Sequence, residues 1–268
     1  MLDCSDVVVQ VLDARDPIGT RSLRLEKHLK SNSRHKHLIL VLNKCDLVPT
    51  WVTRRWVQRL SKEVPTLAFH ASVTRPFGKG ALIALLQQFA RLHSDKPSIS
   101  VGFVGFPNVG KSSMINSLRG KKACNVAPVP GETKIWQYVT LFKSVLLVDC
   151  PGVVPPEQTA RATPQSVVLR GVARAERLED PEEAAEEAIR RSQRIHLEKT
   201  YGVPAASWTD PGDFLRAMAR RMGKLRKGGI EDTQVVARVV INDWQRGKLP
   251  WFIAPPEDGD ESSAHALA

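Results

Sequence analysis

The chain has few cysteines and no long apolar run. Its four cysteines, Cys4, Cys45, Cys124 and Cys150, form no CxxC or Cys/His pattern. This scatter argues against a zinc site and a disulfide framework, and it fits a reducing compartment. No apolar run reaches the roughly 18 residues of a membrane span, and the N-terminus lacks the basic and apolar segments of a secretory signal. We therefore expect a soluble protein with no membrane partner.

Acidic residues are outnumbered along most of the chain. The 268 residues include 28 Asp and Glu against 39 Lys and Arg, which gives a formal charge of +11. Residues 1–152 carry +12, residues 153–255 carry +3, and residues 256–268 carry −4. The positive excess predicts a polyanionic partner without distinguishing RNA from DNA or lipid. The acidic tail, residues 257–268, is expected to be disordered.

Short runs of apolar residues alternate with helix-like stretches in the first part of the chain. They occupy residues 6–13, 37–42, 66–70, 101–105 and 145–149. Their length and flanking turn residues favour strands over buried helix segments, and the alternation predicts a mostly parallel sheet with flanking helices. The expected fold class is α/β, in one domain over residues 1–155. Because DVVVQVLD begins almost at Met1, we expect a fragment cut at a domain edge.

After the segment PGVVPP the pattern becomes helical, which predicts a small all-helical domain over residues 156–256. One helix is expected from Asp180, a capping residue, to Gly202. A second, over residues 210–229, would bury Phe214, Met218, Met222 and Leu225 on one face. A third, over residues 232–247, would bury Val235, Val236, Val239, Val240 and Trp244.

A glycine-rich segment follows the fourth apolar run. Residues 105–112, GFPNVGKS, match GxxxxGK[ST] between a strand and the helix-like SSMINSLRG, a context that disfavours a chance match. Backbone N–H groups and a helix N-terminus would bind phosphate oxygens, Lys111 would reach the β- and γ-phosphates, and Ser112 would bind Mg²⁺. The residues expected at the nucleotide are Asn108, Val109, Gly110, Lys111, Ser112 and Ser113.

Two further segments would complete a magnesium and γ-phosphate site. Asp149 ends a strand before Cys150-Pro151-Gly152, where a carboxylate would hold magnesium and the Gly152 N–H would face the γ-phosphate. A strand-ending aspartate before a turn is the simpler interpretation in isolation, and the upstream phosphate loop makes it less favourable. Thr133, in PVPGETK, is a candidate switch hydroxyl, with a Pro/Gly turn as the alternative.

The strand HLILVLN leads into Asn43-Lys44-Cys45-Asp46, which is suited to recognising guanine. Asp46 can accept hydrogen bonds from N1–H and the 2-amino group of guanine, whereas adenine would leave the carboxylate unpaired, a mismatch worth ~10⁴ or more in selectivity. Lys44 would lie along the base, and Asn43 would brace the loop. The segment His70-Ala71-Ser72 would supply a backbone N–H to guanine O6, either from Ala71 or from Ser72.

The base-recognition segment precedes the phosphate loop, which inverts the order found in ordinary small GTPases. Starting the chain at residue 101 restores that order, and residues 92–100 would join the old termini. A site built on strand ends is fixed in space, so it survives such a circular permutation. The sequence therefore predicts a circularly permuted P-loop GTPase that binds GTP or GDP.

The chain resembles the YlqF-like circularly permuted GTPases of ribosome assembly. The resemblance rests on the motifs LDARDP, FHAS, GFPNVGKSS, PGETK and DCPGVV in this order, and the segment VVINDWQRGKLPWF is similar in particular to the eukaryotic nucleolar branch. The resemblance implies that nucleotide state is coupled to maturation of the large-subunit precursor particle. It also implies binding to pre-rRNA and to ribosomal and assembly proteins, in the nucleolus and nucleus. A GTP-dependent placeholder with incidental hydrolysis is one alternative, and a GTPase of RNA modification or ion transport is another.

The same resemblance implies slow hydrolysis, because Val153 stands where other GTPases use a water-orienting glutamine. It also implies that Asn108 helps to bind potassium, so that Asn108, Lys111, Thr133 and Gly152 form the catalytic set. In the second domain the basic residues Arg216, Arg220, Arg221, Lys224, Arg226 and Lys227 have no acid among them. They are candidates for RNA phosphate contacts, with a solvated surface as the alternative.

Overall fold

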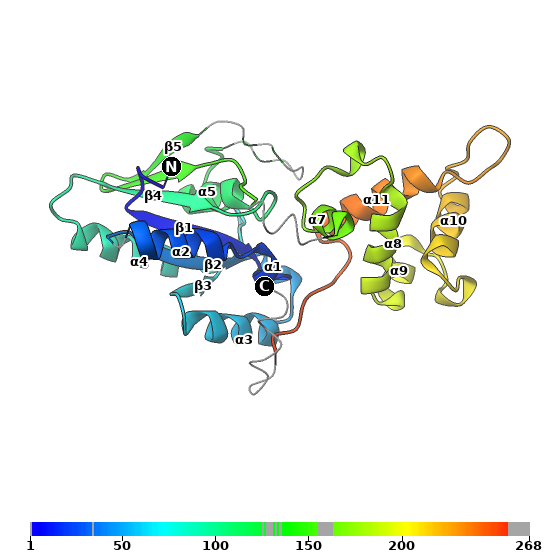
Figure 1. Cartoon of the computed structure of the whole chain (residues 1–268), viewed down its shortest axis with the longest axis horizontal. Coiled ribbons are helices and arrows are strands. Elements are labelled where there is room, and N and C mark those ends of the chain that lie inside the picture. The colour runs from blue at the N-terminus through cyan, green and yellow to red at the C-terminus, as the bar shows by residue number, and fades with distance from the viewer. Residues whose placement is uncertain are drawn as a thin grey trace. The chain divides into compact units, whose positions relative to one another are not determined.

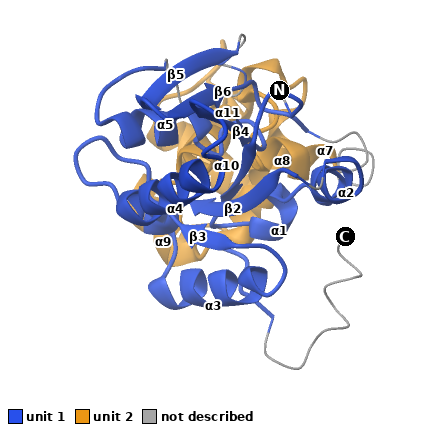
Figure 2. Ribbon diagram, turned by 90° about the vertical axis from the view of Figure 1, so that its left-hand side faces the viewer, with its two compact units in different colours: residues 1–127, 131–155, 252–268 blue, residues 128–130, 156–251 orange. Residues whose placement is uncertain are grey.

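The computed structural model describes residues 2–33, 35–124, 126, 131, 133, 136–154 and 163–256, and the chain forms two compact units (Figure 2). Described residues up to 154 belong to the first unit together with residues 252–256, whereas residues 163–251 belong to the second. The chain therefore returns to the first unit five residues before the boundary expected at 256. Ile253 makes this return contact, because its N–H donates to the Arg15 carbonyl at 2.8 Å and its carbonyl accepts from Trp56 Nε1 at 3.1 Å.

The first unit is built on a six-stranded sheet in the order β3-β2-β1-β4-β6-β5 (Figure 1). The strands are β1 (Val7–Asp13), β2 (His37–Asn43), β3 (Thr66–Ala68), β4 (Ile99–Val104), β5 (Gln137–Phe142) and β6 (Val145–Asp149). All neighbours run parallel except β5, which pairs antiparallel with β6. The five strands expected from the apolar runs are confirmed. The sheet gives the expected α/β class, and β5 is an addition at its edge.

Helices connect these strands and cover the sheet. They are α1 (Pro17–Thr20), α2 (Leu23–Asn32), α3 (Thr50–Ser61), α4 (Lys79–Leu92) and α5 (Lys111–Arg119), with a 3₁₀ turn η1 at Cys45–Leu47. The apolar face of α3, with Val52, Trp56 and Leu60, packs with Leu12, Leu40 and Leu42 of the sheet into one buried cluster. Among the described residues, no helix combines the length and apolar character needed to cross a bilayer.

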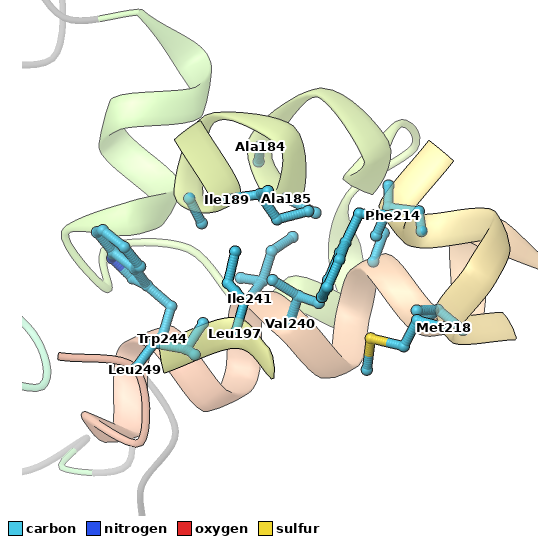
Figure 3. Close-up of a cluster of buried hydrophobic side chains, with 14 of the residues drawn as sticks. Ala184, Ala185, Ile189, Leu197, Phe214, Met218, Val240, Ile241, Trp244 and Leu249 are labelled. Atoms are coloured by element: carbon cyan, nitrogen blue, oxygen red, sulfur yellow. The ribbon is translucent and has the colours of Figure 1, made fainter. Parts of the chain in front are cut away.

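The second unit is helical, and its core draws on most of its helices (Figure 3). Its elements are α7 (Pro164–Leu169), η2 (Ala175–Arg177), α8 (Pro181–Arg191), α9 (Arg194–Tyr201), η3 (Ala205–Ser207), α10 (Pro211–Arg221) and α11 (Thr233–Arg246). Trp244 of α11 is fully buried, stacks on Trp251 with a 4.6 Å centroid distance, and donates from Nε1 to the Leu169 carbonyl. Of the predicted α11 core, Val236, Val240 and Trp244 are buried, whereas Val235 and Val239 are half-buried.

Two predicted helices are shorter than expected. The helix expected over 180–202 is two helices, α8 and α9, because Ser192 has an extended backbone (ψ 145°) and its hydroxyl bonds to the Ala188 carbonyl. The helix expected over 210–229 ends at Arg221, and Met222 and Leu225 are exposed instead of buried. The next residues fold back on themselves, with hydrogen bonds from Arg226 N to the Ile230 carbonyl and from Asp232 N to the Lys224 carbonyl.

Candidate nucleotide-binding site

The Asn43 side chain ties three loops together at the carboxyl ends of β2, β3 and β4. Its Nδ2 donates to the Val109 carbonyl at 2.8 Å, and its Oδ1 accepts from the Ala71 N–H at 3.1 Å. Gly110 makes this approach possible, because a Cβ there would lie 2.3 Å from Asn43 Nδ2. Segments 43–46, 70–72 and 105–112, far apart in the sequence, therefore lie at one edge of the sheet.

Lys44 is held beneath this edge by a buried charge cluster. It has a left-handed backbone (φ 63°), and its Nζ lies 3.0 Å from Asp13 Oδ2. Arg15 binds the same carboxylate at 2.7 Å. Burial raises the pKa of Asp13, but the charges of Arg15 and Lys44 outweigh burial and hold this pKa well below its usual range. The sequence analysis treated LDARDP only as a family motif and did not predict that it supports Lys44. The available signal was the pair Asp13 and Arg15, a carboxylate and a guanidinium two residues apart at the end of a strand.

Asp46, the expected guanine-recognition residue, lies in the turn η1 and contacts His70 from the loop after β3. The Asp46 Oδ1 and His70 Nδ1 atoms are 2.6 Å apart, and both side chains remain partly exposed. His70 was expected only to end a strand, and its contact with Asp46 was not anticipated.

The loop after β3 is fixed through its backbone. Phe69 N donates to the Leu42 carbonyl at 2.8 Å, and Ser117 Oγ of α5 donates to the Ser72 carbonyl at 2.8 Å. The Ala71 N–H already donates to Asn43 Oδ1, so the backbone N–H groups of Ala71 and Ser72 are not equally free to donate to guanine O6. The next backbone amide along the chain belongs to Ser72.

The phosphate loop has the backbone conformation that its glycines predict. Gly105 (φ +148°) has no room for a side chain, because a Cβ would lie 2.4 Å from the Val11 carbonyl oxygen, and Asn108 adopts a left-handed conformation (φ 61°). Lys111, the first residue of α5, donates to the carbonyls of Gly105 at 3.0 Å and Phe106 at 2.7 Å. Burial lowers the pKa of Lys111 to about 8, so phosphate oxygens would stabilise its charged form.

Three oxygen-bearing side chains meet next to the phosphate loop. Ser112 Oγ donates to Asp149 Oδ2 at 2.6 Å and lies 3.0 Å from Thr133 Oγ1. Asp149 is fully buried, its Oδ1 has no nitrogen or oxygen partner among the described residues, the Cys124 thiol interacts with its carboxylate, and burial raises its pKa. A buried carboxylate oxygen with no nitrogen or oxygen partner beside two hydroxyls fits a hard cation such as Mg²⁺, which binds few protein oxygens and keeps several waters. Ser113 follows in the first turn of α5.

The segment after β6 packs directly on the phosphate loop. Val153 N donates to the Gly105 carbonyl at 3.1 Å, and a Cβ on Gly152 would lie 2.6 Å from the backbone nitrogen of Pro107. Gly152 is therefore required for this close approach. The Val153 side chain is largely exposed and offers no polar atom.

The basic residues proposed for RNA contact lie in the second unit and are partly neutralised. Arg216 pairs with Asp213, Arg220 Nε lies 3.4 Å from Glu231, and Arg226 lies 3.1 Å from Asp232. The expectation that neighbours leave this run unneutralised is wrong for these three arginines. Asp213, which pairs with Arg216, precedes the run on α10, and the turn after α10 returns Glu231 to Arg220 and Asp232 to Arg226. The remaining candidates, which have no ion pair among the described residues, are Arg221, Lys224 and Lys227.

The fold and the site together define a P-loop GTPase domain of circularly permuted order. A family model described as 50S ribosome-binding GTPase matches residues 100–199. A solved structure, YlqF from T. maritima with bound GNP, is similar over 96% of this chain and 95% of that chain, with 26% identity and a TM-score of 0.63. In fold and in the order of its motifs, the chain is thus similar to the circularly permuted YlqF-like GTPases.

Two curated relatives are more similar in sequence. The chain is 54% identical over 262 residues to Nucleolar GTP-binding protein 2 of Saccharomyces cerevisiae, covering 97% of this chain and 53% of the relative. It is 55% identical over 262 residues to Nuclear/nucleolar GTPase 2 of Oryza sativa subsp. indica, covering 98% and 48%. The chain therefore spans about half the length of these relatives.

Proposed function

We propose that this chain binds GTP and GDP, hydrolyses GTP slowly, and acts in assembly of the large ribosomal subunit. The observation that carries the nucleotide assignment is the Asn43 bridge, which links the base-recognition segment, the loop after β3 and the phosphate loop. One nucleotide contacting all three loops needs this arrangement. The role in ribosome assembly is supported by the description of the matching family model, 50S ribosome-binding GTPase, and by the word nucleolar in the name of the relative.

Each side chain has a role that follows from its chemistry. Asp46 accepts from N1–H and the 2-amino group of guanine in place of its contact with His70. We assign the O6 contact to the Ser72 N–H instead of that of Ala71, because Asn43 occupies the latter. Lys111 exchanges two loop carbonyls for phosphate oxygens. That exchange keeps a buried ammonium paired throughout binding.

The metal-binding set is Ser112, Thr133 and Asp149, which already lie within hydrogen-bond distance of one another through Ser112. Bound magnesium supplies positive charge to the phosphates. Gly152 brings its backbone against the phosphate loop, where its N–H can meet a γ-phosphate. These contacts bind and orient the nucleotide.

Slow intrinsic turnover follows from Val153, whose side chain cannot hydrogen-bond to an attacking water. We propose that potassium, held with the help of Asn108, supplies part of the missing transition-state charge. The support is the family resemblance and the left-handed backbone of Asn108 in the phosphate loop. Hydrolysis should be faster in potassium than in sodium, and Asn108→Ala should remove the difference.

The partners we propose from the family resemblance are pre-rRNA, the precursor particle, and ribosomal and assembly proteins. The names of the relatives support a location in the nucleolus and nucleus. Lys224 and Lys227 are now the favoured phosphate contacts of the second unit, together with Arg221. Charge reversal of Lys224 and Lys227 should weaken RNA binding and flatten its salt dependence, whereas Arg216→Glu, at a residue already paired with Asp213, should change less.

The test of base recognition is Asp46→Asn. An asparagine amide repels N1–H of guanine, so GTP affinity should fall by about 10²-fold or more, while xanthosine triphosphate, with a carbonyl in place of the 2-amino group, should gain affinity. Asp95→Asn, at an exposed site on the same unit, is the control. Unchanged preference for GTP would overturn the assignment.

A placeholder that binds GTP without needing its hydrolysis is the second candidate. Its support is Val153, which leaves the chain without a side chain to orient water. Single-turnover hydrolysis with and without precursor particles separates the two: stimulation by the particles supports an active GTPase, and an unchanged rate supports the placeholder.

A further inference from the structure

The exposed face of α3 carries positive charge that no acid neutralises. The helix contains no Asp or Glu, and the first acid after it, Glu63, is engaged by Arg21 at 2.7 Å. Arg54, Arg55 and Lys62 are exposed, and none of the three pairs with an acid among the described residues. The first and last of them are eight residues apart, so these cations extend over about 12 Å of helix. This face is therefore suited to an extended polyanion.

Two large aromatic side chains are exposed at the start of this face. Trp51 of α3 is 47% exposed, and Phe252, from the segment that returns to the first unit, is 38% exposed. Their ring centroids are 6.0 Å apart, with the ring planes at 85°. The Arg55 guanidinium lies over the Trp51 ring, 5.6 Å from its centroid. The indole therefore contacts a second ring and a cation while nearly half of the residue stays accessible.

The fold holds both aromatic residues at the surface. The apolar face of α3 is buried against the sheet, and Trp51 lies outside that face. Phe252 is fixed by the backbone of Ile253, which bonds to the Arg15 carbonyl and to Trp56 Nε1. Large exposed apolar side chains that gather at one place are typical of binding surfaces, whereas scattered ones need no explanation.

We propose that single-stranded RNA binds to the α3 surface, which consists of Trp51, Arg54, Arg55, Lys62 and Phe252. A base stacks on the exposed indole, and the cations bind phosphates of the same strand. Stacking of this kind needs an unpaired base, which separates a single strand from a duplex. The proposal extends pre-rRNA binding to the unit that contains the GTP site, and the choice of RNA over DNA rests on the proposed function.

Charge favours RNA over a protein as the ligand of the α3 surface. Residues 1–152 carry a formal charge of +12, whereas residues 153–255 carry +3, so the first unit attracts polyanions more strongly than the second. Lysine is depleted in protein–protein interfaces. Sites for single strands, in contrast, combine aromatic side chains with a row of cations. The α3 surface has both components.

Trp51→Ala in the whole chain tests the stacking contact. Fluorescence anisotropy, with GDP present, measures the affinity for a short unstructured RNA and for the duplex that it forms with its complement. The single-strand affinity should fall by about 5-fold to 150-fold, the range for stacking one base on an aromatic side chain, while the duplex affinity stays unchanged. Trp136→Ala, at a 46% exposed tryptophan of the same unit, is the matched control and should change neither affinity. An equal loss for the duplex would overturn the single-strand assignment.

The phosphate contacts are tested by a triple variant, Arg54→Gln, Arg55→Gln and Lys62→Gln. Each phosphate contact on a single strand contributes about 0.7 to the slope of log K against log salt, so this slope should become shallower by about 2. The control is the triple glutamine variant of three exposed cations from other parts of the first unit, Lys27, Arg91 and Lys143. An equal change in this control would overturn the proposal, because it would show a response to net charge alone.

The indole ¹⁵N–¹H resonance of Trp51, assigned with Trp51→Phe, keeps the test decisive if Trp51→Ala does not fold. We expect this resonance to move when the single-stranded RNA is added to the wild-type chain. An unmoved resonance, or full RNA affinity in Trp51→Ala and in the triple variant, would overturn the proposal. Such a result would favour a protein, or the chain's own acidic residues 257–268, as the occupant of the α3 surface.

Failure of this proposal is distinguishable from failure of the proposed function. RNA affinity that is lost only on charge reversal of Lys224 and Lys227 would overturn the α3 surface and leave pre-rRNA binding in place. A wild-type chain that binds neither RNA would refute pre-rRNA binding by this chain as well.

Discussion

Replacing Asn43 with alanine removes both hydrogen bonds that join the three loops of the nucleotide site. The Val109 carbonyl lies in a residue that is 1% exposed, so losing its partner costs about 1–3 kcal/mol. Ala71 is a partly exposed residue, so water can replace the lost partner of its N–H, and this loss costs about 1 kcal/mol. The free energy of unfolding of the GDP-saturated protein should therefore fall by about 2–4 kcal/mol.

The protein is saturated with GDP so that the free energy of unfolding includes the lost Asn43 hydrogen bonds in either case, whether they form before nucleotide binding or during it. Urea denaturation monitored by hydrogen exchange of the β2 amides reports on the first unit alone. If the bridge forms only on binding, the loss appears as a GDP Kd raised by about 30-fold to 700-fold. Asn32→Ala, at an exposed position of α2, is the matched control and should stay within about 0.5 kcal/mol. A loss in Asn43→Ala no larger than in this control would refute the account of the site.

Three further predictions concern charged groups of the site. Burial lowers the pKa of Lys111 to about 8 in the nucleotide-free fold, below its value in the unfolded chain. The unfolded chain therefore binds more protons than the folded chain above pH 8, so the free energy of unfolding without nucleotide should rise with pH from about 8 to 10. Denaturation measurements on Lys111→Met should lack this rise. His70→Ala removes the partner of Asp46 and should raise GDP affinity by up to about fivefold in equilibrium titration, and a weaker affinity would show that His70 supports the guanine contact. Asp149→Asn should remove most of the magnesium dependence of nucleotide binding while leaving the metal-free Tm equal or higher, since it replaces a buried carboxylate whose pKa burial raises.

Local patterns in the sequence predicted the parallel strands and the loops at their ends, because each apolar run and each glycine acts over a few residues. The edge strand β5 was not expected, since its residues are mostly exposed and show no apolar run. The break at Ser192 was missed because serine is a weak helix breaker, although its N–H and hydroxyl both bond to carbonyls at the end of α8.

The sequence also did not predict contacts between segments that are far apart in the chain. The support of Lys44 by Asp13 and Arg15, and the contact between Asp46 and His70, depend on loops brought together by the sheet. The ion pairs of Arg220 and Arg226 depend on the backbone turn after α10, which local charge counting does not include. The Asn43 bridge itself was foreseen only as bracing of its own loop.

The return of the chain at Ile253 means that the helical unit is an insertion anchored at both ends, not an appended tail. One anchor is the stretch after Asp149, next to the expected γ-phosphate. The other is the Arg15 carbonyl, and the Arg15 side chain holds Asp13, which in turn holds Lys44 under the expected base. The chain therefore leaves the first unit beside the segment expected at the phosphates and returns to it beside the residues that hold Lys44.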